Sequence, residues 1–137
     1  MTAPIKKPAW FAATIVTTLL ATGNPVSAEQ FKRTELQRHD LTGTNMEVIV
    51  ATVEAPPGAT LPRHFHYGEE AVYVLDGSMI ETFEGRQQMS ETGSAYINVR
   101  EVPHGGYKVI GSKPLKVLTI HIVDKGKQMT WPVAHSR

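Results

Sequence analysis

The stretch Gly58–Gly77, GATLPRHFHYGEEAVYVLDG, carries the residues around which the rest of the chain is interpreted. It contains two histidines one residue apart, His64 and His66, and then an acidic pair, Glu69 and Glu70. Alternate side chains of an extended strand share a face, so the two imidazoles are expected to point the same way. A carboxylate that a tight turn brings back beside them would complete three arms of a metal site.

The chemistry of these donors limits the choice of ion. Imidazole and carboxylate together suit iron, manganese, nickel, copper or zinc, and we predict one divalent ion of this group. Of the two glutamates, Glu70 is the predicted ligand, because strand parity puts it on one face with Val72 and Val74. Glu69 is expected either to support the ligands from behind or to lie in solvent.

The stretch resembles the first motif of the cupin family: a glycine, five residues, His-x-His, three or four residues, Glu, six residues, and a glycine. The matching positions are Gly58, His64, His66, Glu70 and Gly77, which fit at every spacing. The resemblance covers roughly residues 46–123. It implies a small β-barrel, the double-stranded β-helix or jelly roll, with a metal bound by three histidines and a glutamate.

The third histidine comes from a second, less complete motif of the family. Gly93 and His104 stand at the separation that the resemblance requires, and His104 is therefore the implied fourth ligand. Val99, Glu101 and Lys108 replace a proline, a glycine and an asparagine of that pattern. From the residues alone, Pro103 and Gly105-Gly106 frame a tight loop that presents His104, and the alternative is an exposed loop histidine.

The remaining pattern is that of short strands separated by turn residues. No stretch after residue 28 keeps a helical apolar period for three turns, so we predict an all-β barrel or sandwich. Asp76-Gly77 is a hairpin signal between two of the strands. A lone histidine inside an apolar strand, His121, is expected to be a satisfied core residue rather than a ligand. The predicted strands span residues 46–53, 61–66, 70–75, 78–83, 87–91, 95–99, 107–110 and 115–123.

Residues 1–28 have the order of a secretory signal peptide. Lys6 and Lys7 form a charged start, residues 10–21 are largely apolar, and Val26-Ser27-Ala28 offers small residues for cleavage before Glu29. The alternative is a membrane anchor that stays uncleaved. We therefore expect a periplasmic or secreted protein with one domain, residues 29–137, whose barrel core spans about residues 46–123.

Charge and cysteine content exclude several classes of function. The full chain has a formal net charge of +1, which becomes −1 when the leader and its two lysines are removed. That balance gives no reason to expect binding to nucleic acid, or to a membrane once the leader is removed. The absence of cysteine excludes disulfides, thiol catalysis and thiolate metal sites.

The segment 70–75 is apolar on both faces, and a barrel interior can cover only one of them. We therefore predict a homodimer that buries Tyr73 and Leu75 or their neighbours. The polar segment 29–44 is expected to be a lead-in arm with one edge strand, and the alternative is that its part Phe31–Leu41 crosses over to the partner.

Three histidines and a glutamate leave coordination positions open for a small molecule, so binding of a small-molecule substrate or ligand is expected. The first hypothesis, from the family resemblance, is an oxygen-dependent cleavage of the dioxygenase type. The second is an isomerase or lyase that acts on a sugar acid, enol or diketone, and the third is a periplasmic binding protein without turnover. Acid–base candidates near the mouth are Glu69, Tyr107 and Arg63, none of which is assigned a catalytic role. Arg63 could also bind a substrate carboxylate if a bulge turned it inward.

Overall fold

A computed structural model describes residues 31–133 of the chain. In this part the chain forms antiparallel strands, as alternating apolar side chains and frequent turn residues predict. The all-β prediction is confirmed. This described part of the chain contains no helix that is long and apolar enough to cross a membrane. The strands are β1 (Lys32–Asp40), β2 (Met46–Ala55), β3 (Thr60–Leu61), β4 (His64–Phe65), β5 (Gly68–Asp76), β6 (Ser78–Thr82), β7 (Gln87–Ser90), β8 (Ala95–Asn98), β9 (Tyr107–Val109), β10 (Leu115–Asp124) and β11 (Trp131–Pro132).

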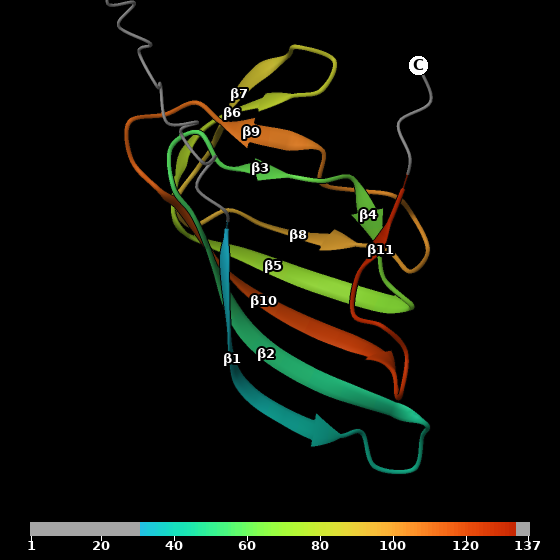
Figure 1. The fold of residues 1–137 in the computed structure, drawn as a ribbon. Coiled ribbons are helices and arrows are strands. Elements are labelled where there is room, and N and C mark those ends of the chain that lie inside the picture. Colours follow the sequence, from blue (N-terminus) through green and yellow to red (C-terminus); the bar gives the residue numbers. More distant parts are fainter. Residues whose placement is uncertain (1–30, 134–137) are drawn as a thin grey trace, which may run out of the picture.

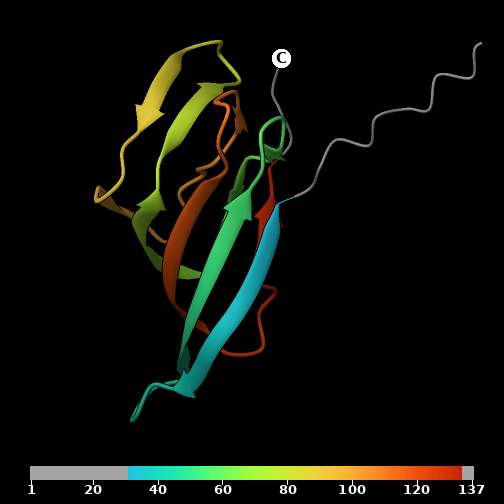
Figure 2. The same ribbon diagram turned by 90° about the vertical axis from the view of Figure 1, so that its left-hand side faces the viewer.

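The strands form two facing sheets and a short ribbon (Figure 1). The larger sheet has the order β1-β2-β10-β5-β8, and the smaller one has the order β3-β9-β6-β7. The ribbon pairs β4 with β11, and it lies at the end of the molecule where β5 begins. Turned by 90°, β1 and β2 run side by side as long twisted strands (Figure 2), as expected for antiparallel neighbours.

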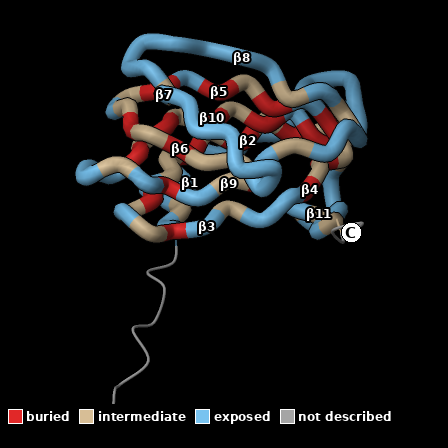
Figure 3. The backbone as a smooth tube through the Cα atoms, turned by 90° about the horizontal axis from the view of Figure 1, so that it is seen from above, coloured by how far each residue is buried: buried red, intermediate tan, exposed pale blue. Residues whose placement is uncertain are grey.

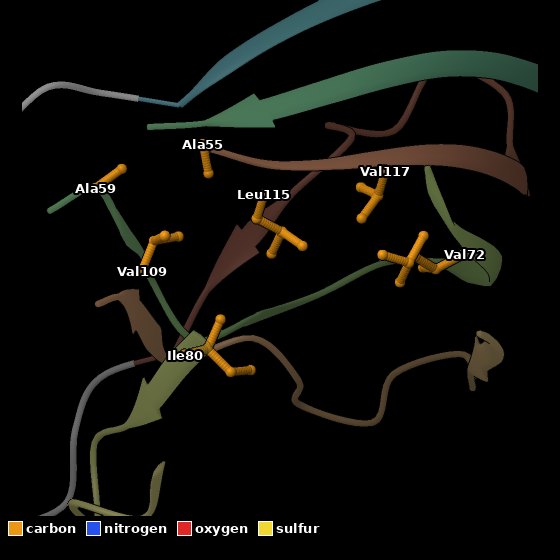
Figure 4. Close-up of a cluster of buried hydrophobic side chains, with 8 residues drawn as sticks. Ala55, Ala59, Val72, Ile80, Val109, Leu115 and Val117 are labelled. Carbon is orange, nitrogen blue, oxygen red and sulfur yellow. The ribbon is translucent and has the colours of Figure 1, made fainter. Parts of the chain in front are cut away.

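Side chains from both sheets meet in an apolar core (Figure 4). Seen from above, the buried positions lie mainly on the central strands of the larger sheet, whereas β8 at its edge is exposed over most of its length (Figure 3). Val72 and Val74 of β5 face inward with Glu70, while Tyr73 is exposed, so the predicted parity of this strand is confirmed. The buried core cluster comprises Ala55, Ala59, Val72, Val74, Ile80, Val109, Leu115 and Val117.

The predicted strand over residues 61–66 is divided in the structure. β3 ends at Leu61 and pairs with β9, whereas β4 begins at His64 and pairs with β11. Pro62 lies in the break, and because proline lacks an N–H group it cannot continue a ladder as a donor. The chain therefore changes pairing partners immediately before the two histidines.

The expected hairpin at Asp76-Gly77 is wrong. β5 pairs with β10 and β8, and β6 pairs with β7 and β9, so this turn is a corner between the two sheets. A Cβ at Gly77 would collide with the backbone oxygen of Ser90, which explains the glycine without a hairpin. Turn chemistry alone does not distinguish a corner from a hairpin, since both require a sharp reversal.

The N-terminal arm forms β1, which pairs with β2 of its own chain along the edge of the larger sheet. The arm is therefore held by its own chain and does not extend away from it. The predicted signal peptide, residues 1–28, lies outside the described residues.

Candidate functional site

Three separate segments deliver the four predicted ligands to one place. His64 lies on β4, His66 follows it directly, and Glu70 lies on β5. His104 comes from the loop between β8 and β9, where its backbone forms a bridge with His64. The two hydrogen bonds of this bridge measure 2.9 and 2.8 Å, and the two imidazole centroids lie 4.5 Å apart. The loop histidine is thus fixed by backbone pairing.

In each of the three histidines, Nδ1 forms a hydrogen bond with a backbone carbonyl oxygen. His64 contacts the oxygen of Pro62 at 2.9 Å, and His104 contacts that of Val102 at 3.0 Å. His66 contacts the oxygen of Met129 at 2.5 Å. A carbonyl only accepts hydrogen bonds, so Nδ1 must carry the proton, and Nε2 of each neutral ring then carries a lone pair. Metal-ligating histidines are commonly oriented in this way.

The lone pairs converge on a carboxylate. Nε2 of His66 lies 3.4 Å from Oε2 of Glu70, and Nε2 of His104 lies 3.3 Å from the same oxygen. Both nitrogens are buried and make no hydrogen bond within the described residues. Ligand atoms at about 2.1 Å from a tetrahedral ion stand about 3.4 Å apart, so these separations match the edges of a coordination shell. The candidate ligand atoms of the three histidines all lie within 4.8 Å of one another.

A metal ion accounts for this arrangement better than protons do. Lone pairs that face a carboxylate repel it unless a cation lies between them. The pKa of His64 is lowered to about 4, chiefly because burial disfavours the charged ring and also because His104 and His66 lie beside it. Burial alone would raise the pKa of Glu70, but contacts with His104, His121 and His66 outweigh it and hold that pKa well below the usual range. The His and Glu cluster can therefore hold a metal ion.

His121 belongs to this cluster, although its position in an apolar strand predicts an ordinary core residue. It lies opposite Glu70 on β10, and its Nε2 approaches Oε1 of Glu70 at 3.2 Å. Asn98 donates a hydrogen bond to the other carboxylate oxygen, Oε2, at 2.7 Å. Together these two residues orient the carboxylate, and His66, Glu70 and His121 also form a second group with metal-binding geometry. The alternation of apolar residues along its strand could have shown that His121 faces inward. The sequence does not show that His121 lies opposite Glu70, because strand pairing is a long-range property.

Of the three acid–base candidates from the sequence, one lines the internal cavity and two are exposed on the outside of the barrel. Glu69 is exposed beside Ile122, on the face of β5 away from the cluster. Arg63 also points outward, with a guanidinium nitrogen 3.9 Å from Glu84, so the bulge that would turn it inward is not present. Tyr107 lines the internal cavity, and its pKa is raised by burial and by the nearby Tyr96 and Glu70, so its phenol stays protonated.

The loop that carries His104 contains a strained residue. Glu101, which stands where the family motif has a glycine, adopts a positive φ of 58°. Its N–H donates to the oxygen of His66 at 2.9 Å, and this bond ties the loop to the ligand segment. Arg100 adds a fork to Asp124, with one nitrogen 3.1 Å from Oδ1 and the other 2.5 Å from Oδ2. The loop therefore keeps its turn despite the missing glycine.

A cavity of about 210 Å³ opens beside the cluster. His64, Glu70 and His104 lie at one part of its wall. Apolar side chains from β2, β5 and β10 also line it, as do Thr130 and Pro132 of the C-terminal segment. The cavity can hold a small and mostly apolar molecule next to the candidate ligands. Its apolar wall includes Val53, Val72 and Val117.

Comparison with known proteins agrees with this geometry. The model of the cupin domain matches residues 51–121. Among solved structures, the polyketide cyclase RemF from Streptomyces resistomycificus is 27% identical, with a TM-score of 0.50, and the match covers 69% of this chain and 65% of the cyclase. A double-stranded β-helix protein from Klebsiella pneumoniae is 17% identical, with a TM-score of 0.58, over 78% of this chain and 89% of that one.

A cupin domain from Bordetella pertussis is 20% identical, with a TM-score of 0.51, over 70% of this chain and 96% of that one. At these identities the Klebsiella and Bordetella structures support the fold alone. No curated protein matches the chain. With the family model covering more than half of the sequence, and with facing antiparallel sheets around a histidine cluster, the chain belongs to the cupin family.

Proposed function

We propose that this protein is a metal-dependent enzyme that acts on a small molecule bearing a carbonyl or enol oxygen. His64, His66, Glu70 and His104 hold one divalent ion, and the cavity beside them receives the substrate. The observation that carries the proposal concerns the Nε2 atoms of His66 and His104. Both are buried beside the Glu70 carboxylate and make no hydrogen bond within residues 31–133. An ion bound there would supply Lewis-acid polarisation of a substrate oxygen.

The chain's own residues supply orientation and a proton. Asn98 and His121 hold the carboxylate of Glu70, so its Oε2 stays turned toward His66 and His104. Tyr107 offers a protonated phenol at the cavity wall, where it could donate a hydrogen bond or a proton to substrate. The apolar side chains on the wall lower the local polarity, which strengthens such polar contacts. This combination favours isomerisation, cyclisation or lyase chemistry without electron transfer.

The likeness to a polyketide cyclase supports the same choice, because cyclisation is among the reactions that a Lewis-acid ion and a protonated phenol can assist. Oxygen-dependent cleavage is the second candidate, since the same donors suit iron, manganese or copper. A binding protein without turnover is the third. A panel of enols, diketones and sugar acids tested with the metal-loaded protein separates them. We expect substrate loss without oxygen uptake, whereas uptake that matches substrate loss would support cleavage, and inertness to the whole panel would support binding alone.

Metal content after single substitutions tests the ligand set. We expect His64→Ala, His104→Ala and Glu70→Ala each to lose most of the metal, because each removes a donor atom and leaves the apolar core intact. Glu69→Ala is the matched control, since Glu69 is a neighbouring glutamate on the opposite face of the same strand, and it should retain full occupancy. Elemental analysis gives the result, with circular dichroism as the check on folding.

The same protein should release its metal in acid. Protons compete with the ion for the imidazole Nε2 atoms, so occupancy is complete at neutral pH and falls as pH decreases.

In the substitution experiment, full metal content in His104→Ala, or a greater loss in Glu69→Ala than in Glu70→Ala, would contradict the ligand assignment.

A further inference from the structure

We infer that Arg33 binds an anionic oxygen group of the substrate, in the cavity that His64, Glu70 and His104 also line. The substrate class is then a small, mostly apolar carboxylate or a similar oxyanion. This inference rests on the proposed function for what happens to the substrate at the metal ligands. The binding contact itself needs only Arg33 and the cavity.

Strand pairing turns Arg33 into the barrel. Arg33 of β1 lies opposite Val53 of β2, which follows the buried inward positions Ile49 and Ala51 at alternate residues. Neighbouring residues in the register share a face, so Arg33 is directed inward with Val53. Both line the cavity that also contains His64 and Glu70, as does Phe31, two residues before Arg33.

The guanidinium of Arg33 is poorly paired. Its Nε and Nη2 are buried and have no hydrogen-bond partner within residues 31–133. Its Nη1 has one acidic neighbour, Oε2 of Glu35 at 3.7 Å. That carboxylate is already bound by Arg38 through two hydrogen bonds of 3.0 and 2.9 Å, so it compensates Arg33 weakly.

The Arg33 side chain is 28% exposed, but its Nε and Nη2 have lost contact with water and gained no hydrogen bond within residues 31–133, which is costly. The two free groups, Nε and Nη2, are part of a planar fork that suits the two oxygens of a carboxylate. Val53, Val72 and Val117 line the same cavity, which makes an apolar body suitable for the rest of the ligand. A cation, an apolar wall and metal ligands in one cavity therefore fit a mostly apolar molecule that carries both an oxyanion and an oxygen that faces the metal.

Benzoate and benzamide provide a test, because the two have nearly the same size and differ in charge. Binding is measured by isothermal titration calorimetry to the full chain, once with zinc bound and once after treatment with a chelator. In the chelated protein we expect benzoate to bind about tenfold or more tightly than benzamide, since charged hydrogen bonds carry that much discrimination. Arg33→Gln should remove the preference, and Arg33→Lys should retain part of it.

Arg63→Gln is the matched control, because Arg63 points outward near Glu84 and should leave the preference unchanged. The melting temperature separates binding from a structural role. If Arg33 mainly binds ligand, Arg33→Gln melts at or above the wild-type temperature, because it removes a partly buried and weakly paired charge. Equal binding of the two probes to the wild type, an unchanged preference in Arg33→Gln, or a much lower melting temperature would overturn the inference. Failure of zinc binding with the preference intact would contradict the proposed function alone.

Discussion

Glu101 is the residue at which the second family motif and the backbone disagree. Within residues 31–133 it is the only residue other than glycine with a positive φ, and the family pattern has glycine there. A left-handed conformation costs an L-residue roughly 1–2 kcal/mol because Cβ approaches the backbone. Two interactions offset that cost and keep the loop in place: the hydrogen bond from the Glu101 N–H to the oxygen of His66, and the bidentate ion pair of Arg100 with Asp124.

Glu101→Gly should therefore stabilise the protein. The relieved strain is partly offset by the greater freedom of glycine in the unfolded chain, so we expect the free energy of unfolding to rise by roughly 0.5–1 kcal/mol. Denaturant unfolding measures the change. Glu91→Gly is the control, because Glu91 is an exposed turn glutamate without a positive φ, and its replacement should lower the free energy. A decrease in both variants would show that position 101 is unstrained.

The C-terminal element β11 has a larger role than its two residues suggest. It pairs with β4, and Trp131 stacks on Phe65 with centroids 6.5 Å apart and planes 15° from parallel. The oxygen of Met129, just before the strand, accepts the hydrogen bond that orients His66. This segment therefore supports the ligand segment from outside the two main sheets.

Truncation after Lys127 should weaken metal binding without unfolding the barrel. The cut removes the partner of His66 Nδ1 and the strand that pairs with His64, and loss of such a supporting partner costs metal affinity about 10- to 100-fold. Competition with a chromogenic chelator measures the affinity. Truncation after Val133 is the matched control, which keeps β11 and should keep the wild-type affinity. Equal affinities for the two truncated proteins would exclude this role for the segment.

At the scale of the whole molecule, the outer face of the larger sheet is unusually apolar. Tyr73 and Ile97 are 46% and 60% exposed, and they line a shallow hollow with Leu118 and Ile120. Antiparallel sheets usually present a polar outer face to water, so an apolar one indicates contact with another protein surface. The sequence predicted a homodimer that buries Tyr73 and Leu75 or their neighbours, and this stays a prediction.

Tyr73→Glu combined with Ile97→Lys should produce a monomer, because charges on both residues would have to be buried in the interface. Light scattering at micromolar concentration should give twice the chain mass for the wild type and the single chain mass for the double variant, with metal content unchanged. Met89→Glu changes a similarly exposed residue on the smaller sheet and should remain dimeric. A monomeric wild type would exclude the dimer.

The sequence by itself determined most of the strands of the two sheets and which side chains of β5 face inward. Alternation of apolar residues is a local property, so the parity of Glu70, Val72 and Val74 could be predicted without knowledge of the partners of β5. The spacing of His64, His66 and Glu70 likewise indicated a cluster, because a strand and a tight turn fix their relative directions.

Only the tertiary structure decided which strands are neighbours. Pairing is a long-range property, and so the Asp76-Gly77 corner looked like a hairpin and His121 looked like an isolated core residue. The same limit explains Arg33 and Met129, which lie far from the histidines in sequence and come to them through β1 and the C-terminal segment. Local patterns fix the direction of a side chain, whereas closure of the barrel fixes what that side chain meets.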